Sequence, residues 1–341
     1  MTPPLIPDRL PVLRSLDLEA DALSVTRIPG TEELFVGADN GSVYHVDLAA
    51  ETPQPQPLIG GHLSYVSGLA NWHDGVISAG SDRRLVWWHR RTHERIHTRE
   101  QAHAKWIRAI AMHPRLPILA SVGDDMVCRL WDAETADLLS ELRGHLEITA
   151  QHFRNKLFAV TFSRDGNFLA TADQTGRVVI WDFEARTQVA VVEATKLYEW
   201  DETAEILNGH SFGGARCLDF SPDGHRLAVG GILNVDAAII KGQALLMVFD
   251  WRSGALSTEY LDDGNCLYEN VRFHHAGDWI VAAPGAGSAT HFNFWNTQDP
   301  KLIKKAEGLV VYDMVLNETS DAIYVVGPKK IAKLSVHAPS T

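Results

Sequence analysis

A repeated pattern constrains the fold of this chain more than any other feature, because copies of one unit must stack on one another to bury their apolar faces. Three neighbouring segments begin at Leu63, Ala104 and Leu157, and each contains three short runs separated by turn residues and ends near a tryptophan. Alternation of apolar and polar residues over about four to eight positions is typical of a half-buried β-strand. The repeat therefore predicts three consecutive strands in each copy, with the tryptophan on the third.

Weaker copies extend the pattern toward both ends of the chain. The residues at the tryptophan position of the seven copies are Val46, Trp88, Trp131, Trp181, Phe249, Trp295 and Leu334. Successive positions lie 39 to 68 residues apart, and four of the six separations fall between 39 and 46. A period of about 40–45 residues is typical of one four-stranded propeller blade per copy. The sequence predicts an all-β fold, a seven-bladed β-propeller with four-stranded antiparallel blades.

The copies also carry a motif that resembles the WD-repeat β-propeller family. Gly61-His62 precedes the second copy and Trp131-Asp132 ends the third, as in that family's Gly-His and Trp-Asp signature. The resemblance covers roughly residues 23–336 and is strongest in the middle copies.

The resemblance implies how the ring closes. The last copy offers three strands, and the stretch PVLRSLDL near the N-terminus has strand character but belongs to no copy. We expect residues 1–20 to supply the missing outer strand of the last blade, which removes an exposed sheet edge. Residues 21–341 then form the rest of a single propeller domain with residues 1–20.

Two copies carry histidine, serine, aspartate and tryptophan at matched spacing. These sets are His62, Ser78, Asp82 and Trp88 in blade two and His103, Ser121, Asp125 and Trp131 in blade three. A nucleophilic triad uses the same residue types, but two copies one repeat apart favour a part that belongs to each blade. The resemblance implies a hydrogen-bonded chain from the carboxylate through the imidazole and the hydroxyl to the indole, which satisfies buried polar groups.

Blade four carries an incomplete version of this set. It has His145, Thr171 and Trp181, but Thr175 occupies the aspartate position. We therefore expect blade four to depend more on apolar packing.

Composition excludes several classes of function. The net charge is −12 and the three cysteines form no CxxC pair, which disfavours nonspecific phosphate binding and a disulfide framework. His274-His275 are neighbours on a predicted strand and point to opposite faces, and neither an HExxH nor a P-loop motif occurs. No inward-pointing carboxylate or histidine recurs at the predicted channel-lining strand. We expect no metal, no cofactor and no catalysis.

The N-terminus lacks a basic start and an apolar run, and no apolar stretch approaches the roughly 18–20 residues that span a bilayer. We expect a soluble, cytoplasmic protein that does not contact membranes and for which nucleic acid is not the favoured partner.

Blade two contains a basic stretch. Its arginines are Arg83, Arg84, Arg90, Arg91, Arg95 and Arg99. The repeat assigns them to the turn before the third strand, to the turn after it and to the outer strand, and places Trp87 on the face opposite Trp88. Charged side chains protect an outer strand against edge-to-edge pairing. The alternative is a docking strip for an acidic partner.

One rim of the predicted propeller is elaborated. Three long insertions, before blade four, before blade five and inside blade five, all fall in connections at the same end of the blades. Long loops in a compact fold are often functional. The resemblance places further side chains at this rim, which we expect to contact a partner: Tyr65, Trp106, Lys156, Ser81, Asp124, Tyr198 and Trp200. Exposed tyrosine and tryptophan are typical interface anchors; packing of these rings beneath the inserted loops is the alternative.

These observations favour a non-catalytic scaffold that recognises a peptide or protein on the elaborated rim as part of a larger assembly. Two alternatives stay open. One is a hydrolase-like propeller with a metal ion in its central channel, and the other is an architectural subunit that docks through the basic outer edge of blade two.

Overall fold

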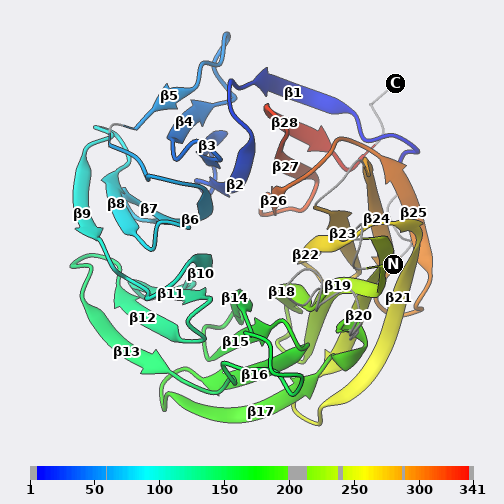
Figure 1. Cartoon of the computed structure of the whole chain (residues 1–341). Helices are drawn as coiled ribbons and strands as arrows, with labels where there is room; N and C mark the ends of the chain where they lie inside the picture. Colours follow the sequence, from blue (N-terminus) through cyan, green and yellow to red (C-terminus); the bar gives the residue numbers. More distant parts are fainter. Residues whose placement is uncertain (1–5, 59, 199–212, 237–240, 286–288, 338–341) are drawn as a thin grey trace.

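Seven four-stranded antiparallel sheets surround a common axis (Figure 1). The computed structural model describes residues 6–58, 60–198, 213–236, 241–285 and 289–337. Within these ranges the only helical element is the short 3-10 turn η1 (Thr195–Leu197), and no helix is long and apolar enough to cross a membrane. The predicted all-β, seven-bladed propeller is confirmed.

The strands follow the repeats in chain order. Blade one contains β2 (Ala22–Arg27), β3 (Glu33–Ala38), β4 (Val43–Asp47) and β5 (Gln56–Pro57), and blade two contains β6 (Val66–Trp72), β7 (Gly75–Gly80), β8 (Leu85–His89) and β9 (Arg95–Arg99). Blade three contains β10 (Ile107–Met112), β11 (Ile118–Gly123), β12 (Cys128–Asp132) and β13 (Leu138–Leu142), and blade four contains β14 (Leu157–Phe162), β15 (Phe168–Asp173), β16 (Arg177–Asp182) and β17 (Thr187–Glu193).

The remaining three blades have the same order. Blade five contains β18 (Ala215–Phe220), β19 (Arg226–Asp236), β20 (Lys241–Asp250) and β21 (Ala255–Asn265), and blade six contains β22 (Tyr268–Phe273), β23 (Trp279–Pro284), β24 (His291–Asn296) and β25 (Leu302–Glu307). Blade seven contains β26 (Asp313–Leu316), β27 (Ala322–Gly327), β28 (Lys330–Ser335) and β1 (Val12–Asp17).

The N-terminal strand closes the ring. β1 pairs antiparallel with β28, with Asp17 opposite Lys330, and becomes the outer strand of blade seven, as predicted (Figure 1). The segment before it also joins blade six, since the backbone N–H of Leu10 donates to the carbonyl of Glu307 at 2.9 Å. Leu10 is buried in the core shared by blades six and seven. The sequence did not predict this second attachment.

The tryptophan position of each copy lies on the third strand of its blade and is buried. Trp88 packs with Phe35 of blade one, whereas Trp87 packs with Leu119 of blade three. The Trp87 indole N–H donates to the carbonyl of Ala133 at 3.0 Å. Since each buried aromatic ring removes about 150–250 Å² from water, these adjacent rings, on opposite faces of β8, stabilise two separate blade interfaces.

A β-bulge interrupts the first strand of the described blades one to six, at equivalent positions. The extra residues are Leu23, Ser67, Arg108, Phe158, Arg216 and Glu269. A bulge opposes two residues to one and re-aims a side chain. Here all six side chains, with Tyr312 before β26, line a central cavity of about 400 Å³.

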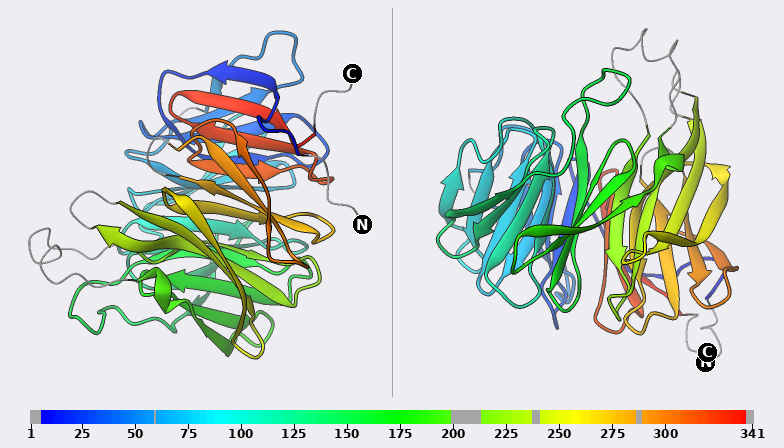
Figure 2. Two further views of the ribbon diagram at one scale, coloured as in Figure 1. Left: turned by 90° about the vertical axis from the view of Figure 1, so that its right-hand side faces the viewer. Right: turned by 90° about the horizontal axis from the view of Figure 1, so that it is seen from below.

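The described parts of the insertions lie at one end of the blades, because the loop into each first strand and the turn between second and third strands share one end of an antiparallel blade. Residues 199–212 and 237–240 of these insertions lie outside the described residues. The insertion within blade five is largely strand: the β19–β20 ladder continues to the pair Asp236 and Lys241. Figure 2 shows this hairpin rising beyond the neighbouring strands. Ile232, on β19 of this hairpin, is buried, and β-branched residues such as isoleucine prefer strands.

Candidate functional site

The polar set in blade two forms one continuous hydrogen-bonded chain. Asp82 lies 3.0 Å from His62 Nδ1, and His62 Nε2 lies 2.8 Å from the Ser78 hydroxyl. The Trp88 indole N–H donates to the same hydroxyl at 2.8 Å. Ser78 is fully buried, so its oxygen is not accessible to a substrate.

Blade three repeats this geometry. The Asp125–His103, His103–Ser121 and Trp131–Ser121 contacts measure 2.9, 2.7 and 2.8 Å. Burial lowers the pKa of His103, although Asp125 opposes that change. Burial raises the pKa of Asp125, but hydrogen bonds from His103 and Arg129 outweigh it and hold the pKa well below its usual range. These pKa changes fit an ionised Asp125 carboxylate beside a neutral His103 imidazole. The Nδ1–H of His103 then donates to the carboxylate.

Blade four has a complete network, so the prediction that it lacks one was wrong. Asp173, not Thr175, lies 2.8 Å from His145 Nδ1, and the Thr171 hydroxyl contacts His145 Nε2 at 2.8 Å. The Trp181 indole N–H donates to Thr171 at 3.0 Å.

The geometry at the end of the second strand explains the substitution. Asp173 ends β15 and faces the start of β14, the position that Gly80 holds in blade two. A Cβ atom added to Gly80 would lie 2.5 Å from His62 Nδ1. A side chain at this position is therefore aimed at the histidine, and an aspartate there replaces the one two residues later.

Tyr65 and Trp106 are accessible on the rim. They precede β6 and β10 and are 51% and 47% exposed, so they do not pack beneath the inserted loops. Leu63 and Leu146, each directly after a Gly-His pair, are 76% and 73% exposed, and Ile148 is also exposed. The sequence reasoning missed these three aliphatic residues, although their place beside the motif was visible. We call the set Leu63, Tyr65, Trp106, Leu146 and Ile148 the rim surface.

The other predicted rim residues differ in access. Ser81 is buried, and its hydroxyl donates to that of Ser64 at 2.8 Å. Asp124 accepts two hydrogen bonds from Arg108, both at 2.7 Å. Tyr198, after η1, is half-buried, and Trp200 lies outside the described residues.

Lys156 lies directly before β14 and is half-buried. Burial lowers the pKa of Lys156, and the nearby Arg108 and Arg216 lower it further while Asp124 opposes them. Lys156 therefore lies near Arg108 and Arg216, which both line the central cavity.

The basic stretch of blade two is largely neutralised by neighbouring acids. Arg84 pairs with Glu100 at 2.7 Å and Arg99 with Asp137 at 2.8 Å. Asp74 lies 3.7 Å from both Arg90 and Arg91. Arg83 and Arg95 are exposed and make no ion pair within the described part of the chain.

Three of the first strands carry a carboxylate, at three different positions of the blade. Asp219, Glu269 and Asp313 lie on β18, β22 and β26 of three successive blades. Asp219 accepts the backbone N–H of Phe273 at 2.6 Å, and Asp313 accepts that of Val25 at 2.9 Å. These two carboxylates join neighbouring blades, which leaves Glu269 as the one of the three that makes no such bond among the described residues.

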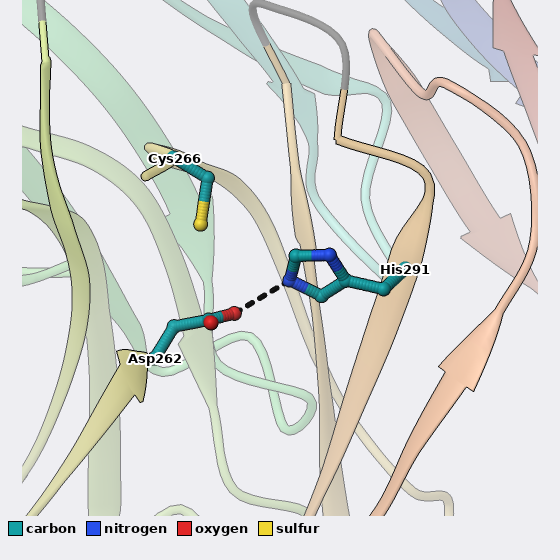
Figure 3. A group of neighbouring side chains, drawn as sticks. All are labelled: Asp262, Cys266 and His291. Carbon is teal, nitrogen blue, oxygen red and sulfur yellow. Dashed lines mark hydrogen bonds and ion pairs between the residues drawn. The ribbon is translucent and has the colours of Figure 1, made fainter. Parts of the chain in front are cut away.

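Asp262, Cys266 and His291 bring three potential metal ligands together, with ligand atoms within 4.8 Å of one another (Figure 3). Asp262 already accepts hydrogen bonds from His291 at 2.6 Å, from Lys305 at 2.9 Å and from the backbone of Gly264 at 2.7 Å. Burial and the nearby Asp262 raise the pKa of Cys266 to about 12, so it is a thiol. A cation would have to displace the Lys305 ammonium and ionise the thiol, so the donor set fits a structural polar network better than a metal centre.

The two adjacent histidines are not on a strand as predicted. His274 and His275 follow the end of β22 in a turn, and their ring centroids lie 4.1 Å apart. His274 also stacks on Trp279, with ring centroids 4.6 Å apart.

Comparison with known proteins gives matches in the middle of the chain. Residues 94–132, 137–182 and 202–234 match the family model WD40, described as WD domain, G-beta repeat. A component of chromatin assembly factor 1 of Mus musculus is 28% identical over 130 residues, covering 31% of this chain and 21% of that protein. Small ribosomal subunit protein RACK1 of Neurospora crassa is 25% identical over 109 residues, covering 31% and 29%.

Protein transport protein sec13 of Emericella nidulans is 26% identical over 118 residues, covering 33% of this chain and 37% of that protein. The alignments thus span between 21% and 37% of the length of these three relatives.

Proposed function

This chain belongs to the WD-repeat β-propeller family, and from that premise we propose that it is a non-catalytic platform that binds a peptide or protein partner on its rim surface. The exposure of the rim surface carries this proposal. Two aromatic and three aliphatic side chains are accessible in the loops that enter three consecutive blades. Clustered exposed apolar groups with aromatic members are typical of interaction sites.

The names of the relatives support an assembly role. They describe a component of a chromatin assembly factor, a small ribosomal subunit protein and a protein transport protein. Components of this kind work through contacts with other macromolecules, and we extend that role to this chain. A cytoplasmic location stays a prediction.

We further propose that the networks of blades two and three are structural. Ser78 and Ser121 are fully buried, and each hydroxyl is occupied by a histidine and an indole. A nucleophile must reach its substrate, so this burial disfavours a nucleophilic triad in these blades. The alternative of a hydrolase-like propeller with a metal ion in its central channel does not depend on these hydroxyls. Docking through the basic edge of blade two is also disfavoured, because acidic neighbours neutralise four of its six arginines.

A pair of matched double variants tests the rim surface. Tyr65→Ala/Trp106→Ala removes two exposed rings, and the control Ile96→Ala/Leu302→Ala removes two comparably exposed side chains from outer strands. Both variants are compared with the unmodified chain by affinity capture from the native cell lysate and quantitative mass spectrometry. Because interface aromatics carry much of the binding energy, we expect the rim variant to recover a partner about tenfold less or worse.

The control should recover that partner as the unmodified chain does, and circular dichroism should confirm that both variants are folded. Equal recovery by the rim variant would reject the rim surface. The exposed, unpaired Arg83 and Arg95 would then be the next residues to replace.

A further inference from the structure

We propose that Lys156 and Arg216 form a receptor for one acidic side chain of the partner segment that lies on the rim surface. The proposal rests on the proposed function and names the chemistry of the partner. It assigns a role to cationic groups that have no hydrogen-bond acceptor among the described residues.

Four side chains from three blades stack on one another beside the central cavity. The Arg216 guanidinium lies 3.9 Å from the centroid of the Phe158 ring. On blade three, the Arg108 guanidinium lies 4.9 Å from the Trp106 ring and 5.5 Å from Phe158. Stacking on an aromatic face fixes the guanidinium plane and reduces the entropy lost when its donors bind a ligand. The exposed Trp106 of the rim surface is therefore continuous with the cavity mouth.

The two guanidinium groups differ in how their charge is compensated. The charge of Arg108 is compensated by the Asp124 carboxylate, to which Arg108 donates two hydrogen bonds. Arg216 makes no ion pair or hydrogen bond with the described residues, and its buried Nε–H has no acceptor there, so the nearby Glu269 offsets its charge only through space. A buried donor without a partner is costly, and a carboxylate that binds two N–H groups of an arginine compensates both the donors and the charge.

Lys156 adds a second cation without an acceptor. Its ammonium makes no hydrogen bond or ion pair in the part of the chain that the structure describes. Proximity to Arg216 and Arg108 lowers the pKa of Lys156, after the larger effect of burial. An anion placed between the two unpaired cations would relieve their mutual repulsion.

The carboxylates that line the same cavity limit the size of this anion. Glu269, on the blade next to that of Arg216, and Asp313 both line the cavity, and Glu269 interacts electrostatically with Arg216. The nearby Asp21, Glu269 and Asp39 also contribute, after burial, to a raised pKa of Tyr312. A polyanion such as nucleic acid would meet these carboxylates, and the net charge of −12 adds to the repulsion. One acidic side chain on an extended segment brings a single negative charge to Lys156 and Arg216, which keeps this repulsion small.

The test uses the full chain and bead-bound libraries of 11-residue peptides. Each library has one fixed central residue, and the positions around it are degenerate. The fixed residue is glutamate, the uncharged isostere glutamine, lysine or phosphoserine. We expect the glutamate library to be recovered about tenfold more than the glutamine library, as for a charge-assisted contact. Preferential recovery of phosphoserine over glutamate would identify the acidic group as a phosphate monoester, whereas preference for lysine would overturn the proposal.

Three variants assign the effect to residues. Lys156→Gln and Arg216→Gln should each bring the glutamate-to-glutamine ratio close to one. Arg95→Gln, at an exposed unpaired arginine on β9, should leave the ratio unchanged. Equal recovery of glutamate and glutamine libraries, recovery of neither, or a ratio unaffected by Lys156→Gln would each overturn the proposal.

The Tyr65→Ala/Trp106→Ala variant distinguishes failure of the acidic receptor from failure of the proposed function. If Tyr65→Ala/Trp106→Ala abolishes recovery of every library while the unmodified chain shows no charge preference, the rim surface stands and the acidic receptor falls. If the double variant binds normally and keeps the preference for glutamate, the rim surface is rejected and the charged pair stands.

Discussion

At the scale of single residues, the buried polar groups constrain the structure of the blades more than the exposed charges do. Each buried hydroxyl or imidazole needs a partner inside the protein, so its neighbours are determined by geometry. In blades two to four the same chain of contacts forms with serine or threonine in the middle. The arginines of the outer edge, by contrast, pair with surface carboxylates whose contributions are small.

Ser121 provides a direct test of the network. Ser121→Ala leaves His103 Nε2 and the Trp131 indole N–H without their shared partner in a fully buried site. We expect the free energy of unfolding to fall by about 2–3 kcal/mol, measured by urea denaturation. The control Ser15→Ala, exposed on β1, should change it by less than about 0.5 kcal/mol. A loss no larger than the control's would mean that the hydroxyl contributes little to stability.

At the scale of elements, the first strand of each blade connects the rim with the cavity. The bulge follows directly after the residue that pairs with the end of the second strand. It therefore directs Arg108 toward the cavity two residues after Trp106 reaches the rim. The residue at the end of the second strand must have a small side chain, because the backbone that enters the first strand passes close to it.

Gly123 is where this constraint is tightest in blade three. A Cβ atom there would lie 2.3 Å from the carbonyl oxygen of Trp106. We expect Gly123→Ala to lower the free energy of unfolding by about 1–3 kcal/mol, because backbone must move to relieve the overlap. Thermal and urea denaturation measure this loss.

The matched change Gly75→Ala places its Cβ 3.3 Å from the carbonyl of Trp72 and should cost clearly less. Equal losses in the two variants would show that the approach of Trp106 to Gly123 does not limit the blade.

At the scale of the whole molecule, closure of the ring depends on the two ends of the described chain meeting. β1 covers the edge of β28, and Leu10 is buried between blades six and seven. An uncovered strand edge is a template for pairing with another chain. We propose that residues 1–20 and 21–341 form one folding unit.

Removal of residues 1–17 tests that unit. The loss of β1 and of the buried Ile6 and Leu10 should lower the free energy of unfolding by about 3–5 kcal/mol or more. Light scattering should show concentration-dependent association through the exposed edge of β28. The control is Leu13→Ala, at an exposed position on β1, and its light scattering should match that of the unmodified full chain. A truncated chain with unchanged stability and scattering would contradict a role of β1 in closure.

The sequence alone predicts the blade count and the strand carrying each tryptophan-position residue, because alternation and turn residues are local signals with a fixed period. The closing strand is predicted from the resemblance to the family. The sequence also places Tyr65 and Trp106 in the loops that enter their blades. It misplaces the blade-four carboxylate, since a fixed spacing points to Thr175 while the direction of the side chain selects Asp173.

Only the tertiary structure decides which side chains from different blades meet. The stacking of Arg216 on Phe158, the proximity of Arg216 to Lys156, and the attachment of Leu10 to blade six each join residues from separate elements. Their juxtaposition follows from the closed ring and from the bulges that turn side chains toward its axis. No local pattern encodes such distances, because they are set by how whole blades pack against one another.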